Sequence, residues 1–154
     1  MNADNYVLAC PSAIEHDAHG TATLVGNQCA DCGETYFPAA SGCTRCTSTN
    51  LSRFNFGRHG TLWTWTIQSF LPKTPYNSGE TDATFKPYGV GYIEMPCGIK
   101  IESRLSVAVA DKLNIGMPMT MSLKTYGKTP EGADLVTFVF SPAGSDIRGV
   151  QGNE

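Results

Sequence analysis

Cys29-Ala30-Asp31-Cys32-Gly33 is followed by Cys43-Thr44-Arg45-Cys46, with ten residues between Cys32 and Cys43. A CxxC turn points two sulfur atoms inward from one tight knuckle, so two such turns can complete a tetrahedron around a metal ion. Gly33 directly follows the first pair and suits a turn that requires a residue with a free φ angle. This spacing predicts a four-thiolate zinc site in a small ribbon.

The predicted zinc is structural, because four cysteine ligands fill a tetrahedral site and leave no position for water or substrate. The four cysteines could instead form disulfides or hold an iron ion. Disulfides require an oxidising compartment, whereas the first residues show no basic segment followed by an apolar one, which favours a cytoplasmic protein. An iron site of the rubredoxin kind would make the chain an electron carrier. Cys10 and Cys97 lie outside the pattern and are expected to be isolated reduced thiols.

Five segments after the ribbon show the two-residue periodicity of strands. In the first, Trp63, Trp65 and Ile67 alternate with polar residues, which predicts one half-buried face. The segments are Gly60–Phe70, Tyr88–Met95, Ile99–Ser106, Met117–Tyr126 and Leu135–Ser141, with a short helix expected at Val109–Leu113. This order predicts an OB-fold barrel, whose closure removes exposed strand edges. The expected fold is therefore mainly β: a rubredoxin-like zinc ribbon followed by a five-stranded OB-fold barrel with one short helix.

The chain is expected to have four parts. These are an N-terminal segment at residues 1–20, the zinc ribbon at 21–55, the barrel at 56–142 and a C-terminal tail at 143–154. The N-terminal segment reads as irregular, with a short helix near Ser12–His16 in which Ser12 is the N-cap and Glu15 its capping-box partner. The ribbon has too few apolar residues to fold alone, so metal binding should supply its folding free energy.

The connection from Phe70 to Pro87 is long for a compact domain, and loops of such length are usually functional or disordered. It contains the aromatic residues Tyr76 and Phe85 and the cations Lys73 and Lys86. Because aromatic side chains are costly to leave in water, we favour an ordered arm that packs on a partner or covers a ligand over a floppy insertion.

Several stretches together resemble one family. After the ribbon come Gly60-Thr61-Leu62-Trp63-Thr64-Trp65-Thr66, then Pro87-Tyr88-Gly89-Val90-Gly91-Tyr92-Ile93-Glu94, then Leu113-Asn114-Ile115-Gly116-Met117-Pro118. In this order, over roughly residues 20–142, they are similar to the small zinc-ribbon/OB-fold proteins associated with acyl-CoA enzymes. The second knuckle departs from many such ribbons, since it reads Cys46-Thr47 in place of Cys-Gly, and the tail after Ser141 is not diagnostic.

The resemblance implies a non-catalytic accessory subunit bound to a thiolase-fold large subunit, in a hetero-oligomer such as a heterotetramer. The partner would carry Claisen-type carbon–carbon bond cleavage or formation, for example thiolytic cleavage of an aromatic acylsuccinyl-CoA such as benzoylsuccinyl-CoA. Assemblies of HMG-CoA synthase with acetoacetyl-CoA thiolase, and steroid side-chain aldolases, are the alternatives within the family. The coenzyme A thioester would be bound jointly with the partner, and this chain would shape its access.

The candidate contacts with coenzyme A or the partner are aromatic and cationic. Trp63 and Trp65 are candidates, with burial in the barrel core as the alternative for at least one of them. Cations could meet the phosphates of coenzyme A, with a solvated surface role as the alternative for each. The remaining candidates are Arg45, Arg53, Arg58, Lys73, Tyr76, Phe85, Lys86 and Tyr88.

Catalytic motifs are missing from the sequence. His16, His19 and His59 form no HExxH, and neither GxSxG nor GxxxxGK[ST] occurs. An alternative function is binding of single-stranded nucleic acid, in which OB folds and zinc ribbons recur. The formal charge of −3, which becomes −5 when four thiolates and one Zn2+ add −4 + 2, argues against it. We therefore expect no nucleic acid as partner, and no membrane, since no stretch approaches the ~20 apolar residues of a span.

Overall fold

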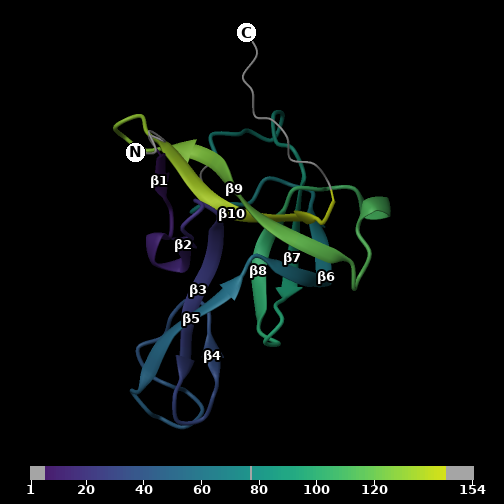
Figure 1. The fold of residues 1–154 in the computed structure, drawn as a ribbon. Helices are drawn as coiled ribbons and strands as arrows, with labels where there is room; N and C mark the ends of the chain where they lie inside the picture. Colours follow the sequence, from purple (N-terminus) through teal and green to yellow (C-terminus); the bar gives the residue numbers. More distant parts are fainter. Residues whose placement is uncertain (1–5, 77, 145–154) are drawn as a thin grey trace.

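The computed structural model describes residues 6–76 and 78–144, and this part of the chain is mainly β (Figure 1). Its elements are β1 (Tyr6–Leu8), the 3-10 turn η1 (Pro11–Ala13), β2 (Ile14–His16), β3 (Ala22–Cys29), β4 (Thr35–Tyr36), β5 (Leu51–Gly57), β6 (His59–Gln68), β7 (Tyr88–Glu94), β8 (Lys100–Leu105), the 3-10 turn η2 (Ala110–Lys112), β9 (Pro118–Lys128) and β10 (Asp134–Pro142).

Five strands close into a barrel in the order β10-β8-β7-β6-β9, and β9 pairs with β10 again. The pairings of β6 with β7, β7 with β8, β6 with β9 and β9 with β10 are all antiparallel. A short parallel contact, with Phe140 opposite Leu105, joins β10 to β8. The five strands and their order confirm the OB-fold barrel predicted from the sequence.

The second sheet forms the ribbon, which extends below the barrel in Figure 1. Its central strand β3 pairs antiparallel with β2, β4 and β5. Strand β1 lies elsewhere and pairs in parallel with the start of β10, from Tyr6 opposite Asp134 to Leu8 opposite Val136. The expectation of an irregular N-terminal segment is therefore wrong for β1 and β2, because the edges of β10 and β3 offer backbone partners that no local pattern reveals.

The two predicted helices are also corrected. Val109–Leu113 contains only the 3-10 turn η2, and both Val109 and Leu113 are extended. At Ser12–His16, the turn η1 leads directly into β2, where Ile14 is buried and pairs with Leu24. Segments this short cannot offset the cost of helix nucleation, so tertiary pairing prevails. No helix among the described residues has the length and apolar character needed to cross a membrane.

A β-bulge in β6 separates the two tryptophans. The pairing of β6 with β7 shifts between Leu62 and Thr64, so the extra residue is Trp63. Trp63 is 50% exposed, whereas Trp65 packs against the core. The alternation predicted for Trp63 is wrong, because one inserted residue reverses the faces of the strand on either side of it. The expectation that at least one tryptophan belongs to the core is confirmed by Trp65.

One continuous core joins the ribbon to the barrel. Buried Leu24 of β3 and Phe56 of β5 belong to the same cluster as Leu62 and Phe140 of the barrel. Phe37, which follows β4, packs edge-to-face on Phe56 at 6.1 Å between ring centroids, and on Phe138 of β10 at 5.9 Å. The ribbon is therefore held against the barrel by packed aromatic rings.

We predict that Gly89→Ala destabilises the barrel. A Cβ at Gly89 would lie 2.3 Å from the backbone oxygen of Val107 and 3.0 Å from Cβ of Leu105, so the strands would have to separate. Overpacking of this kind costs about 1–3 kcal/mol of unfolding free energy, measurable by urea denaturation. Gly127→Ala in β9 is the control, since a Cβ there meets nothing within 4 Å. Equal stability of the two variants would contradict the close approach.

Candidate metal site and aromatic pocket

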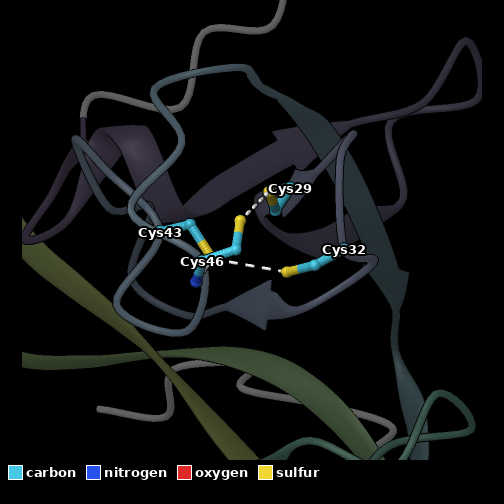
Figure 2. A group of neighbouring side chains, drawn as sticks. All are labelled: Cys29, Cys32, Cys43 and Cys46. Carbon is cyan, nitrogen blue, oxygen red and sulfur yellow. Dashed lines mark hydrogen bonds between the residues drawn. The ribbon is translucent and has the colours of Figure 1, made fainter.

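The four predicted ligands meet at the tip of the ribbon (Figure 2). The sulfur atoms of Cys29, Cys32, Cys43 and Cys46 all lie within 4.8 Å of one another, and the Cys29–Cys46 and Cys32–Cys43 pairs are each 3.5 Å apart. Zn–S bonds of about 2.3 Å in a tetrahedron place sulfur atoms about 3.8 Å apart. The cluster therefore fits a closed four-thiolate zinc site, and a bound zinc would cross-link the two knuckles.

The two knuckles share one backbone geometry. The amide of Gly33 donates to the carbonyl of Cys29 at 2.9 Å, and the amide of Thr47 donates to the carbonyl of Cys43 at 2.9 Å. Both closing residues have a positive φ, 80° for Gly33 and 64° for Thr47. Gly33 thus has the free φ that the sequence predicted. Thr47 occupies a region that β-branched residues rarely adopt, so the second knuckle is strained.

Tyr36 of β4 supports the second knuckle. Its hydroxyl lies 3.1 Å from Cys43 Sγ and accepts a hydrogen bond from the Thr44 amide at 3.0 Å. Donation by this hydroxyl, helped by the backbone amides of Cys46 and Arg45, lowers the pKa of the Cys43 thiol to about 6. Because the thiolate is the metal ligand, this contact favours the form of Cys43 that binds zinc. Sequence spacing alone did not identify Tyr36, since its partner is seven residues away on another turn.

A pocket of about 480 Å³ lies on the barrel, away from the cysteines. Its lining combines a loop residue, the β7–β8 face and the β9–β10 hairpin: Tyr76, Tyr88, Val90, Glu102, Ser103, Arg104, Tyr126, Thr137 and Phe138. Strand β1 pairs with β10 as far as Val136, and β8 pairs with it at Phe140. Thr137 and Phe138 lie between these two contacts, so the pocket occupies the place where the β8 and β10 walls diverge.

Arg104 is the cation of this pocket, and aromatic rings hold it. Its guanidinium carbon lies 3.7 Å from the ring centroid of Tyr88 and 5.8 Å from that of Tyr76. Its Nη2 donates to the Tyr76 hydroxyl at 2.8 Å. The Tyr76 and Tyr88 rings are nearly parallel at 6.3 Å, and Phe85 meets Tyr88 edge-on at 6.1 Å. These contacts fasten the Phe70–Pro87 loop to the barrel, so its described part is an ordered arm.

The structure brings together only part of the predicted contact set. Tyr76, Phe85 and Tyr88 gather beside the pocket. The predicted cations do not line it: Arg45 pairs with Glu34 at 3.5 Å, Arg53 pairs with Glu15 at 2.8 Å, and Lys73 and Lys86 are exposed on the arm.

Arg58 makes a hydrogen bond within the barrel, since its Nη2 donates to the Met121 carbonyl at 3.0 Å. Sequence reasoning missed Arg104. One signal for Arg104 was available in the sequence. Arg104 lies on the polar face of the predicted strand at residues 99–106. The preceding predicted strand begins at Tyr88, where the aromatic arm returns to the barrel.

Two family models match consecutive parts of the chain. The model of the rubredoxin-like zinc ribbon domain of ChsH2 matches residues 23–52, and the model of its C-terminal OB-fold domain matches residues 55–124. The chain belongs to the ChsH2/DUF35 family. Its four-cysteine cluster lies at the place of that family's zinc ribbon.

The chain is also similar to individual members. The benzoylsuccinyl-CoA thiolase subunit BbsA of Thauera aromatica is 24% identical over 131 residues, which are 84% of this chain and 84% of that protein. A DUF35 domain-containing scaffold protein of Pyrococcus furiosus is 27% identical over 120 residues, 77% of this chain and 82% of that protein. A solved Ltp2-ChsH2(DUF35) aldolase structure superimposes with a TM-score of 0.58 at 26% identity, over 79% of this chain and 85% of that chain.

We predict that Cys46→Ser lowers the zinc content of the purified protein well below one ion per chain, because three thiolates no longer close the tetrahedron. Hydrogen exchange should accelerate around the two knuckles and remain slow in the barrel strands, whose buried cluster does not include the cysteines. Cys97→Ser is the control, since Cys97 is exposed and outside the cluster. Full zinc occupancy in the Cys46 variant would contradict the assignment.

A second prediction concerns the Tyr36 hydroxyl. Tyr36→Phe keeps the ring and removes the hydrogen bond to Cys43, so zinc affinity should fall by about 10–100-fold in competition with a chelator. Tyr6→Phe provides the comparison, because the Tyr6 hydroxyl bonds to His16 at 3.2 Å and not to a cysteine. If both variants bind zinc as the parent protein does, Tyr36 has no role in holding the ligand.

Proposed function

We propose that this chain is a zinc-stabilised, non-catalytic accessory subunit of a thiolase-type acyl-CoA enzyme. The observation that supports it best is the match to both ChsH2 domains in the same order along the chain. Its relatives, which are a thiolase subunit, a scaffold protein and a member of an aldolase assembly, support the same class of role. The partner would be a thiolase-fold large subunit that carries the Claisen-type chemistry, in a hetero-oligomer such as a heterotetramer.

An exposed aromatic pair supplies a candidate docking surface on the barrel. Trp63, displaced outward by the bulge, meets Tyr92 edge-on at 6.4 Å between ring centroids, and Tyr92 is 41% exposed. Lys100 lies 4.9 Å from the centre of the Trp63 ring. Trp and Tyr are enriched at the energetically important centres of protein interfaces. We assign this pair, on the outer face of β6, β7 and β8, to the contact with the large subunit.

The arm from Phe70 to Pro87 is our candidate for shaping the passage of the thioester. Its described part is ordered by Tyr76 and Phe85, while Lys73 and Lys86 remain exposed and Phe70 is 72% exposed. Exposed cations on an ordered arm suit the phosphates of coenzyme A. As substrate we propose an aromatic acylsuccinyl-CoA such as benzoylsuccinyl-CoA, on the strength of the similarity to BbsA along most of both chains.

The proposal is tested by identifying the genes adjacent to that of this chain and co-producing the chain with a thiolase-fold protein that they encode. We expect the two to co-purify, and thiolytic activity to be lost when this chain is omitted. Trp63→Ala should weaken assembly by at least tenfold, as roughly expected for an interface hot spot. Ile115→Ala, an exposed apolar residue outside the pair, is the control. Full activity of the large subunit alone would refute the accessory role.

A further inference from the structure

The charge of Arg104 is not neutralised by an ion pair within the described residues. No carboxylate oxygen there lies within 4.0 Å of its guanidinium nitrogens, in contrast to Arg45 and Arg53. Two acidic groups lie in this region, and the pKa of Glu80 is lowered by hydrogen bonds from Ser78 and the Lys86 amide and, to a smaller extent, by the charge of Arg104. Glu102 accepts a hydrogen bond from the Tyr92 hydroxyl at 3.4 Å, and Glu80 accepts one from the Lys86 amide at 3.2 Å. Arg104 therefore has acidic groups nearby but no direct carboxylate contact among the described residues, so its free donors can meet the anion of a ligand.

Arg104 is also held in a fixed position. Its stacking on Tyr88 and its bond to the Tyr76 hydroxyl restrain the guanidinium at the pocket wall, and that bond engages one of its five N–H donors. A guanidinium restrained in this way can bind a flat carboxylate through paired hydrogen bonds with little loss of side-chain entropy. This arrangement is that of an anion-recognition group, and it differs from a solvated surface arginine.

The remaining walls suit an apolar body of limited size. Val90, Tyr126 and Phe138 contribute hydrocarbon and ring surface to the lining. A volume of about 480 Å³ is within the range of small-molecule sites. Glu102 also lines the pocket and adds negative charge, which disfavours a dianion such as phosphate more than a monoanion.

We propose that this pocket binds a small monocarboxylate with an aromatic or acyl body. The carboxylate pairs with Arg104, and the body packs between Tyr126 and Phe138. The site is built wholly from residues of this chain, so its binding can be measured without a partner subunit. It gives the OB-fold barrel a ligand of its own, at a site that adjoins the exposed Trp63–Tyr92 pair through Glu102.

Titration of the zinc-loaded full chain, followed by amide NMR shifts, tests the proposal. The probes are benzoate, butyrate and acetate, with benzamide as the uncharged match of benzoate and inorganic phosphate as the dianion. Benzoate should produce saturable shifts at Val90, Ser103 and Phe138, with a dissociation constant on the order of millimolar, as expected for so small a ligand. Benzamide and phosphate should bind at least about tenfold more weakly.

Two variants test separately how much the charge of Arg104 and the apolar wall contribute to benzoate binding. Arg104→Met should weaken benzoate binding by about tenfold or more and leave benzamide unchanged, whereas Arg53→Met, which alters an exposed ion pair on the ribbon, should change neither. Because Arg104→Met could loosen the arm, Tyr126→Ala is the second variant. Tyr126 is 49% exposed, so its truncation should preserve the fold while weakening benzoate several-fold more than acetate.

Three results would overturn the proposal. The first is equal binding of benzoate and benzamide, or benzoate binding that survives Arg104→Met. The second is tighter binding of phosphate than of benzoate. The third is the lack of saturable carboxylate binding at tens of millimolar, roughly the weak limit for such a fragment. If, in that third case, the pocket amides are protected only by the large subunit, the pocket is part of the docking surface.

Discussion

The positions of both sites depend on the apolar core that runs unbroken from the ribbon into the barrel. Strand β3 buries Leu24 in this core and ends at Cys29, so one strand connects a metal ligand to the core shared with the barrel. On the other side of the ribbon, Phe37 follows the Cys43 partner Tyr36 and packs on Phe138, which lines the pocket. The metal cluster and the pocket are thus joined through packed side chains.

The free energy of zinc binding can offset the backbone strain at Thr47 in the ribbon. Thr47 holds a positive φ of 64° to close the second knuckle, which costs a non-glycine residue roughly 1–2 kcal/mol. Structural zinc binding supplies about 10–16 kcal/mol in small zinc modules, so the strain is a minor cost. A departure from glycine after Cys46 is therefore compatible with a closed site, and the Thr47 amide makes the same hydrogen bond as its Gly33 counterpart.

The barrel presents aromatic residues in two separate settings. Trp63 and Tyr92 form an exposed pair, whereas Tyr76, Phe85 and Tyr88 are packed together by the returning arm. The arm predicted from the sequence as a partner or ligand element thus forms a wall of a pocket on its own barrel. The chain therefore carries two surfaces of different character: the exposed pair that we propose as a protein contact, and the pocket that we propose as an anion site.

Features that depend on residues close together in the chain could be predicted from the sequence alone. Two CxxC turns predicted the thiolate cluster, and period-two alternation predicted the five barrel strands, since both follow from geometry within a few residues. Contacts between distant segments could not be predicted from the sequence. The bulge at Trp63, the strands β1 and β2, and the enclosure of Arg104 by Tyr76 and Tyr88 all arise from pairing across the fold. The backbone partner or ring that stabilises each of them lies on a separate element, so only three-dimensional packing could assign their roles.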